Sequence, residues 1–376
     1  MSYVTRWSAL LWALAGCFSS AIAIEAPDAS TQPAAPAQPQ GAREIKPRDE
    51  SAFVQVLQRS AHHRNLTGLK IAPDVVAALA KGDVAGAITH LSQQAAGGNN
   101  DANIALVRIQ HWCNRFANAR PPEAQAQIAR LPPTLDPERA ARAAGVILAE
   151  ESYRKTASEG CARAQFDYGG IEGRLRAAAE AGDPASATEL AQFIRDPERR
   201  QAMLQGAADK GFAPAQYVLA TGRLMAVQRG ETTENVASIR LLLKQAGLSI
   251  NKAKVDLANC MALGCDGHPA DAAGAAAFGT DAARDGEPGA FLSMARMPWG
   301  MRMKLDQLLA WQYFGDRLSE AGCVGENYVT ATVTFDQTIK ALEQRMDAAT
   351  LERARGQADA IWRDNGERAK REQGCG

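Results

Sequence analysis

The sequence predicts an all-α protein built as an α-solenoid of antiparallel helix pairs. Good helix formers dominate the composition, and aromatic residues make up only 6% of the chain. Runs of β-branched residues, which strands prefer, are scarce. Glycines recur at Gly211, Gly247, Gly286 and Gly322, at intervals of 36, 39 and 36 residues. Because a period of roughly 20 to 50 residues is typical of repeat arrays, these intervals predict stacked helical units.

Each unit carries the same short signature. An apolar residue is followed by a pair of small residues, then a glycine, and then an alanine four positions later. The copies cover residues 153–164, 207–215, 278–290 and 314–322. A glycine after a run of helix formers suits the left-handed position just past a helix end. The signature therefore predicts that one helix ends at the glycine and that a second begins near the alanine.

The apolar residues of the signature should form the buried stripe of the first helix in each unit. They lie eight positions before each glycine and one helical turn from a small residue, so both face the same way. These residues are Met203, Ile239, Phe278 and Phe314. The small alanines Ala164, Ala215 and Ala290 let the second helix approach the first closely.

This pattern resembles the Sel1-like repeat family, relatives of the tetratricopeptide repeat. The family pattern is W-Y-x-x-A-A-x-x-G-x-x-x-A-Q-x-x-L-G, and residues 153–165 and 207–219 match it well. The resemblance covers residues 150–325. It weakens at Gly182, only 22 residues after Gly160, and at Gly247, where Asn251 stands in place of alanine. It implies a superhelix that binds other proteins.

Residues 1–23 read as a secretory signal peptide. A short apolar run is followed by Ala21-Ile22-Ala23, an A-x-A cleavage pattern. The same stretch contains Leu14-Ala15-Gly16-Cys17, which looks like a lipobox with Cys17 as the lipidated residue. Both processing routes stay open, and cleavage after Ala23 is favoured. No other apolar run approaches the roughly 20 residues of a membrane span.

The remaining segments are expected as follows. Residues 24–48 are rich in Pro, Ala and Gln and cannot bury enough apolar surface to fold. Residues 49–149 hold N-terminal helical units: a first helical unit over 52–94, an amphipathic helix over 103–116 and a proline-punctuated connection over 121–137. Residues 326–376 form a C-terminal capping region, whose helix covers 336–373. The alternating stretch 329–335 is either an extended linker or a helix start.

Charge excludes one class of partner. The chain carries 42 basic and 42 acidic residues, so its formal net charge is zero. It has no polybasic run and no basic patch interleaved with aromatics, which are typical of nucleic-acid binders. We therefore expect no nucleic-acid partner.

Cysteine usage indicates an oxidising compartment. Once Cys17 is removed or lipidated, six cysteines remain, and an even number in an exported chain suggests disulfides. Cys260 and Cys265 are the predicted pair, because a helix ending at Gly264 would turn Cys265 back toward Cys260. The alternative is a metal site made of Cys260, Cys265, Asp266 and His268, whose ligand spacing is incomplete. The other pairings cannot be read from the sequence.

No enzyme class is supported. The glutamate–serine pair at Glu151-Ser152 resembles the acid motif of lytic transglycosylases, but the later motifs of that family are missing. The common motifs of serine hydrolases, zinc proteases and P-loop proteins are missing as well. We expect neither catalysis nor a cofactor. His62 and His63 should be solvated near a helix end, and the tryptophans should pack in the core.

The predicted function is that of an exported scaffold or adaptor of the bacterial cell envelope. In helix-pair solenoids the first helices usually line the concave face, and here they cover 197–210, 234–246, 271–285 and 305–321. The predicted groove residues are Arg199, Arg240, Lys244, Gln307, Trp311 and Gln312. The alternative is a structural or lipid-anchored envelope component whose groove binds a glycan such as peptidoglycan. A protein groove should combine charged and apolar side chains, whereas a glycan groove should expose aromatics beside carboxylates and amides.

Overall fold

A computed structural model describes residues 45–118, 122–231, 237–265 and 267–376. In these ranges every regular element is a helix, which confirms the all-α prediction. The signal peptide with Cys17, and the linker as far as residue 44, lie outside the described residues. None of the helices in the described ranges is long and apolar enough to cross a membrane.

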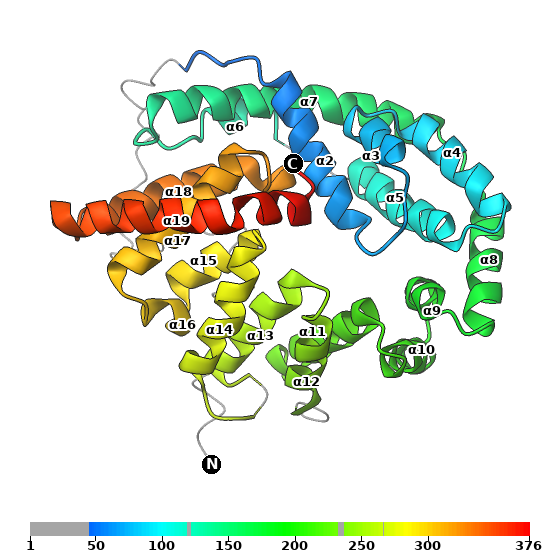
Figure 1. The fold of residues 1–376 in the computed structure, drawn as a ribbon. Helices are drawn as coiled ribbons and strands as arrows, with labels where there is room; N and C mark the ends of the chain where they lie inside the picture. The colour runs from blue at the N-terminus through cyan, green and yellow to red at the C-terminus, as the bar shows by residue number, and fades with distance from the viewer. Residues whose placement is uncertain (1–44, 119–121, 232–236, 266) are drawn as a thin grey trace, which may run out of the picture.

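Helix pairs follow one another along most of the chain (Figure 1). The α-helices are α2 Ser51–Asn65, α3 Pro73–Ala80, α4 Val84–Ala96, α5 Asn100–Asn118, α6 Ala124–Ile128, α7 Pro137–Arg163, α8 Tyr168–Glu180, α9 Pro184–Leu190, α10 Pro197–Asp209, α11 Ala213–Gln228, α12 Ala237–Ala246, α13 Asn251–Leu263, α14 Ala272–Arg284, α15 Pro288–Arg296, α16 Pro298–Met301, α17 Leu305–Glu320, α18 Tyr328–Glu343 and α19 Ala348–Gln373. Two short 3-10 helices are η1 Ala191–Phe193 and η2 Gly325–Asn327.

The predicted first helices coincide with α10, α12, α14 and α17. Gly211, Gly286 and Gly322 follow α10, α14 and α17 with φ of 80°, 77° and 84°, in the left-handed region that the signature requires. Ala215 and Ala290 are fully buried in the next helices. Ile239 and Phe314 are also fully buried, whereas Met203 and Phe278 are partly exposed.

Two marker glycines do not end a helix in the predicted way. Gly160 lies inside α7, which continues to Arg163. A Cβ at Gly160 would come within 3.1 Å of both the Gly82 carbonyl oxygen and the Val84 side chain, so this glycine permits a close helix approach instead. Gly247 follows α12 without adopting the left-handed conformation.

The C-terminal region also differs in detail from the prediction. Residues 329–335 belong to a helix, α18, so the extended alternative is wrong. The single run expected over 336–373 is divided between α18 and α19 by a break at residues 344–347. α19 packs along α17 and also reaches α14 and α2.

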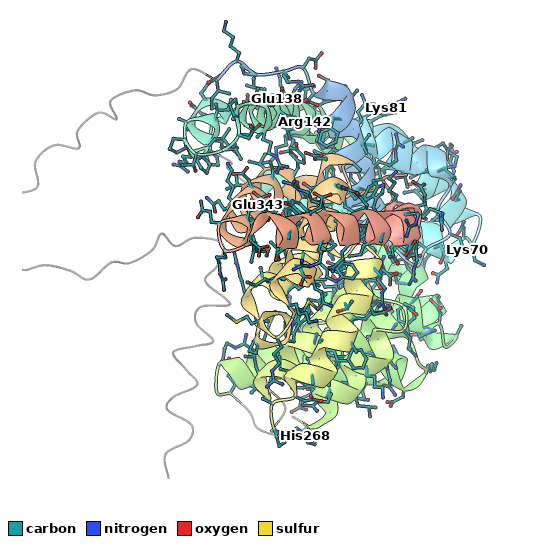
Figure 2. The ribbon with its side chains drawn as sticks, turned by 60° about the vertical axis from the view of Figure 1, so that its left-hand side comes forward. Lys70, Lys81, Glu138, Arg142, His268 and Glu343 are labelled. Carbon is teal, nitrogen blue, oxygen red and sulfur yellow. A yellow bond between two sulfur atoms is a disulfide. The ribbon has the colours of Figure 1, made fainter. Side chains whose placement is uncertain are left out.

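The array closes on itself. We call the contact of α2, α6 and α7 with α17, η2, α18 and α19 the seam. Figure 2, in which Arg142 marks α7 and Glu343 the end of α18, shows α7 stacked on the C-terminal helices. A solenoid with free ends would leave these faces in solvent, whereas here the first and last units cover each other.

Polar and aromatic contacts hold the seam. Arg139 of α7 donates two hydrogen bonds, of 2.9 and 2.5 Å, to the carboxylate of Asp316 on α17. The guanidinium of Arg142 lies 4.1 Å from the ring centre of Phe53, which packs edge-on against Tyr328. These contacts join residues that are far apart in the sequence.

Three disulfides lie in the described residues. Cys260 and Cys265 are bonded, with Cα atoms 4.9 Å apart, as predicted. Cys113–Cys161 ties α5 to α7, and Cys323–Cys375 ties the end of α17 to the end of α19. Both cysteines of the alternative metal site are thus consumed, and no cluster of three metal-binding side chains occurs in the described part of the chain.

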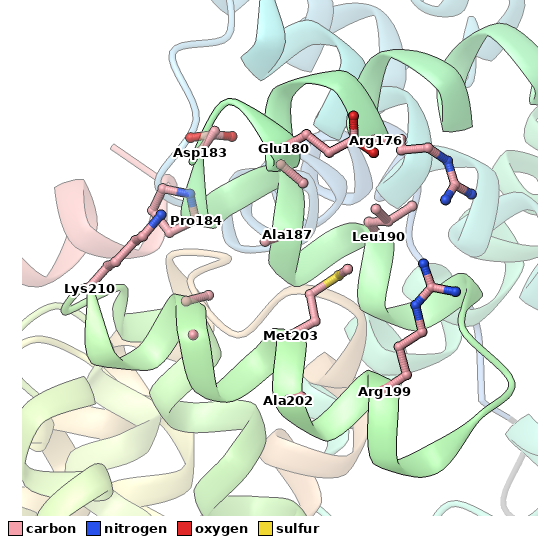
Figure 3. A pocket seen from close by; sticks show the side chains of 13 residues that line it. Arg176, Glu180, Asp183, Pro184, Ala187, Leu190, Arg199, Ala202, Met203 and Lys210 are labelled. Atoms are coloured by element: carbon pink, nitrogen blue, oxygen red, sulfur yellow. The ribbon is translucent and has the colours of Figure 1, made fainter.

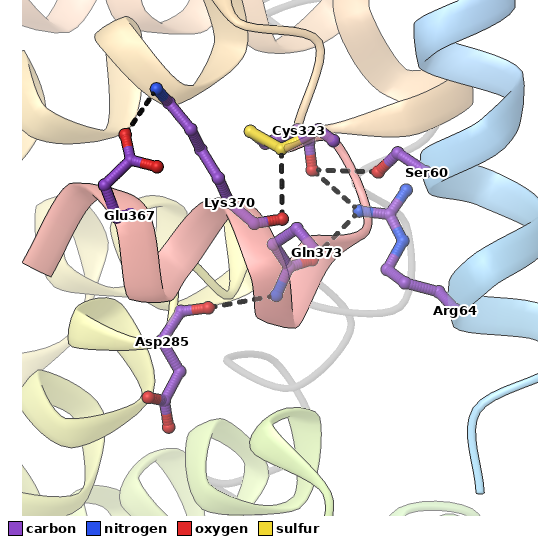
Figure 4. The surroundings of a disulfide bond; sticks show 8 residues. Ser60, Arg64, Asp285, Cys323, Glu367, Lys370 and Gln373 are labelled. Atoms are coloured by element: carbon purple, nitrogen blue, oxygen red, sulfur yellow. Dashed lines mark hydrogen bonds and ion pairs between the residues drawn. A yellow bond between two sulfur atoms is a disulfide. The ribbon is translucent and has the colours of Figure 1, made fainter.

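The C-terminal disulfide lies beside the seam (Figure 4). Arg64 of α2 donates to the Cys323 carbonyl at 3.1 Å and to the Gln373 side chain at 3.3 Å. Gln373 in turn donates to the Asp285 carbonyl at 3.1 Å. The end of α19 is therefore connected to α2, α14 and α17 at once.

Candidate functional site

The inner side of the array is lined by second helices, not by first helices as predicted. Figure 1 shows α11, α13 and α15 turned toward the middle of the molecule, with α12 and α14 outside them. Charge interactions across the interior support this arrangement. Arg64 of α2 interacts with Glu287 at the start of α15, and Glu287 also interacts with Lys252 and Asp256 of α13. Tyr217 of α11 donates to Asp256 at 2.8 Å.

The structure separates the six predicted groove residues. Trp311 is 9% exposed and packs against Phe314, and Gln312 is 1% exposed and donates to the Phe291 carbonyl at 3.1 Å. Both assignments are therefore corrected, because these side chains belong to the packed interior. Arg240 is half-buried on α12, whereas Lys244 and Gln307 are exposed on α12 and α17.

Arg199, also a member of that set, lines a cavity. We call the depression between α8 and α10, which α9 and η1 also line, the α8–α10 groove (Figure 3). It consists of two adjoining cavities of about 300 and about 280 Å³. Arg176, Leu190, Arg199 and Met203 line both cavities, so the two form one continuous depression.

Local sequence signals build the groove. Asp183 and Asp196 cap α9 and α10, and each is followed by a proline in the first turn, which favours a helix start. Gly182 turns the chain between α8 and α9 with φ of 95°, and Lys210 donates to its carbonyl at 2.7 Å. Two short, well-capped helices therefore follow α8 at fixed angles.

The floor of the groove is apolar. Leu190 is 3% exposed, and Met203 is half-buried beside it. Alanines of α8, α9 and α10 fill the remainder of the lining of the larger cavity. Because these side chains are small, the helices lie close together and still leave room for an incoming apolar group. Figure 3 shows Arg176 and Arg199 at one end of this floor.

Most acidic groups of the lining are already bonded. Asp183 accepts hydrogen bonds from the Ser186 amide at 2.8 Å and from Asn100 at 2.6 Å. Burial alone would raise the pKa of Asp183, but these hydrogen bonds outweigh it and lower the pKa below its usual value. Asp196 accepts from the amides of α10. Glu172 pairs with Arg176 at 2.7 Å.

Fewer of the basic side chains of the lining are bonded to other described residues. Arg195 and Arg199 are exposed and form no ion pair with any described residue; Glu180 is the one groove carboxylate in the same condition. An incoming anion would therefore meet two unpaired guanidinium groups, while the carboxylates of the cap residues are occupied. The groove lining contains no serine, cysteine or histidine that could act as a nucleophile or base.

A second polar group lies in the interior and was missed by the sequence analysis. His62 is 1% exposed, so the prediction of a solvated histidine is wrong. The Tyr153 hydroxyl donates to the Leu79 carbonyl at 3.0 Å, so it accepts from His62 Nε2, also at 3.0 Å. This places a proton on His62 Nε2, and burial lowers the pKa of His62 to about 4, so the ring is neutral near pH 7.

The glutamate–serine pair has a structural place. Glu151 and Ser152 are exposed in the middle of α7, and the Glu151 carboxylate accepts from the Ala124 amide at 3.3 Å. That contact holds α6 against α7. The neighbouring Glu150 is more buried, and burial raises its pKa to about 7.

The sequence contained one signal for the groove that went unused. The interval between Gly160 and Gly182 is much shorter than the other intervals, and α8 begins just there. An irregular unit in a repeat array changes the spacing of neighbouring helices, and the groove lies at this irregular unit.

No family model and no curated protein matches the chain. Among solved structures, it is similar to c5321, a protective antigen of uropathogenic Escherichia coli strains that displays an SLR fold. The identity is 16% and the TM-score 0.31, over 85% of this chain and 78% of that chain. The helix pairs above rest on this chain's own structure.

Proposed function

We propose that this protein is a non-catalytic scaffold of the bacterial cell envelope that binds an extended protein segment in the α8–α10 groove. The segment would place an apolar side chain on Leu190 and Met203 and an acidic side chain near Arg199. The observation that carries this proposal is the groove itself, an apolar floor beside guanidinium groups without an ion pair. Protein interaction surfaces commonly combine apolar anchors with arginine.

The groove chemistry favours a peptide over a glycan. Phe193, which is partly buried, is the one aromatic residue of its lining. Sugar rings are usually recognised by exposed aromatic faces together with amides and carboxylates, as the sequence analysis anticipated. The peptidoglycan alternative therefore has less support at this site.

Cysteine pairing supports an envelope location. All six cysteines in the described residues are in disulfides, which form and persist in oxidising compartments. The proposed division of the chain keeps residues 1–23 as signal peptide, 24–48 as linker, 49–149 as N-terminal units, 150–325 as repeats and 326–376 as the cap. Cleavage after Ala23 or lipidation at Cys17 would be distinguished by mass spectrometry of the wild type and of Cys17→Ser.

The test is affinity capture from envelope extract with matched variants. Arg199→Glu reverses a charge in the groove, and Met203→Asp places a charge on its floor. Arg200→Glu is the control, because Arg200 is exposed on the same helix and does not line the groove. We expect both groove variants to capture at least tenfold less partner than the wild type, and the control to capture as much as the wild type.

Equal capture by Arg199→Glu, Met203→Asp and the wild type would show that the groove is not the binding site. Co-sedimentation with insoluble peptidoglycan that survives in the groove variants would instead support the glycan alternative at another surface.

A further inference from the structure

A second, smaller cavity lies at the seam. It has a volume of about 130 Å³ and lies among the last turn of α2, the second half of α5 and η2. Trp112 of α5 contributes to its wall and packs edge-on against His62, with ring centres 5.0 Å apart. The cavity is thus built by segments that only the closure of the array brings together.

Two opposite charges face this cavity from different elements. Arg115 comes from α5 and Glu326 from η2, and both side chains are exposed. Neither forms an ion pair with any residue in the described ranges. Arg64, the other cation of the lining, is already bonded to the Cys323 carbonyl and to Gln373. The cavity therefore presents the Arg115 guanidinium, which has no ion-pair partner in the described ranges, and the Glu326 carboxylate, which also attracts Arg64.

A hydrogen-bond donor completes the lining. The side-chain nitrogen of Asn65 is buried and has no protein partner in the described part of the chain. Buried amide groups without a partner are uncommon, since leaving one unbonded costs free energy. The lining thus offers a donor in addition to a cation, an anion and an indole ring.

We propose that this cavity binds a small α-amino acid in its zwitterionic form. The ligand's carboxylate accepts from Arg115 and from the Asn65 amide, and its ammonium group donates to Glu326. Its short side chain packs on Trp112. The cavity volume of about 130 Å³ suits a ligand of the size of glycine, alanine or serine.

Titration calorimetry on the full chain tests this assignment with three probes. Free alanine carries both charges, N-acetylalanine lacks the ammonium group, and alaninamide lacks the carboxylate. We expect alanine to bind and each capped analogue to bind at least tenfold more weakly, which is about 1.4 kcal/mol. A bulky amino acid such as tryptophan should not bind.

Variants assign the two charges to the two ends of the ligand. Arg115→Gln should weaken the binding of alanine at least tenfold. Glu326→Gln should weaken it as much and should also abolish the difference in affinity between alanine and N-acetylalanine. Arg59→Gln is the matched control, because Arg59 is exposed on α2 away from the lining. All three replaced side chains are exposed, so thermal melting should stay unchanged and loss of binding will not report unfolding.

Two results would overturn the proposal. One is the absence of any heat up to about 10 mM alanine, a concentration that reveals millimolar dissociation constants. The other is tight binding of N-acetylalanine with no penalty relative to alanine, which would indicate a site for a bare carboxylate such as a peptide C-terminus. This site is independent of the α8–α10 groove, so either proposal can fail alone.

Discussion

Burial shifts the pKa values of two interior groups, His62 and Glu150, in opposite directions. Burial lowers the pKa of His62 from 6.5 to about 4. Burial raises the pKa of Glu150 from 4.5 to about 7. The charge of Arg154 opposes this rise, and the charge of Glu326 adds to it. One oxygen of Glu150 is buried without a hydrogen-bond partner among the described residues. The folded state therefore favours the neutral form of both groups.

These shifts predict that His62 and Glu150 change the pH dependence of stability in opposite directions, so that their contributions cancel. Between pH 4.5 and 6.5 the unfolded state holds a proton on His62 that the folded state lacks, so His62 makes stability rise with pH. In the same window the folded state holds a proton on Glu150 that the unfolded state lacks, so Glu150 makes stability fall with pH. The contribution of the pair to the free energy of unfolding should be nearly flat across this window.

Glu150→Gln should expose the contribution of His62. Relative to the wild type, the variant's free energy of unfolding should gain a positive slope of up to about 1.4 kcal/mol per pH unit between pH 4.5 and 6.5. Urea unfolding at several pH values measures this slope. His62→Gln should give the opposite slope, and identical slopes in all three proteins would contradict the account.

Glycines inside helices mark the closest approaches between elements. A Cβ at Gly315 of α17 would lie 2.7 Å from the ring of Phe291 and 2.8 Å from the ring of Phe335. These two rings come from α15 and α18, so α17 is held between its neighbours by the absence of a side chain. No real Cβ fits at such distances without a shift of the rings.

Gly315→Ala should lower stability although alanine is the better helix former. Overpacking typically costs about 1 to 3 kcal/mol, which exceeds the gain in helix propensity of ~1 kcal/mol. Gly356→Ala in α19 is the control, because a Cβ there meets nothing within 4 Å. It should stabilise by roughly 0.5 to 1 kcal/mol. Denaturant titrations of both variants would refute this packing if they shifted in the same direction.

Elements with local signals could be predicted from the sequence. The ends of α10, α14 and α17 follow from capping residues, prolines and left-handed glycines that act within one turn. The length of α7 could not be predicted in this way, because Gly160 is used for a close contact with α4 rather than for a helix end. The same residue type serves both purposes, and only the packing partner distinguishes them.

The site residues show the same division. Arg199 lies on the exposed side of α10 and lines the α8–α10 groove, which is not the concave face for which the sequence predicted it. Trp311 and Gln312 were misplaced because α18 and α19 cover α17, a contact between helices that no local pattern encodes. The inner side of the array is set by the twist between units, which the signature does not report.

Closure of the array is a property of the whole molecule. It joins α2 and α7 to the last three helices through contacts between residues more than a hundred positions apart, such as Arg139 with Asp316 and Arg64 with Cys323. The Cys323–Cys375 disulfide lies next to the Arg64 contact and fixes α19 to α17, and Cys113–Cys161 fixes α5 to α7. The closed form covers the faces of the first and last units that an open solenoid would leave in solvent, and it leaves the α8–α10 groove accessible.

Breaking the Arg139–Asp316 pair should weaken the whole fold. Asp316 is 6% exposed, so Arg139→Gln leaves a buried carboxylate without its cation, at a cost of about 3 kcal/mol. The double variant Arg139→Gln with Asp316→Asn should recover part of that loss. Arg163→Gln, at the exposed end of α7, should change stability by less than about 0.5 kcal/mol. Additive effects of the two changes in a double-mutant cycle would argue against this contact.

Small-angle X-ray scattering of residues 45–376 tests the closed architecture most directly. A compact chain of this length has a radius of gyration of about 20 Å, and the closed array should lie close to that value. An open row of helix pairs, stacked at about 8 to 10 Å per helix, would be elongated and exceed roughly 25 Å. A value near 20 Å with a single symmetric distance distribution is the result we predict. A value above 25 Å with a long tail in the distribution would contradict the seam.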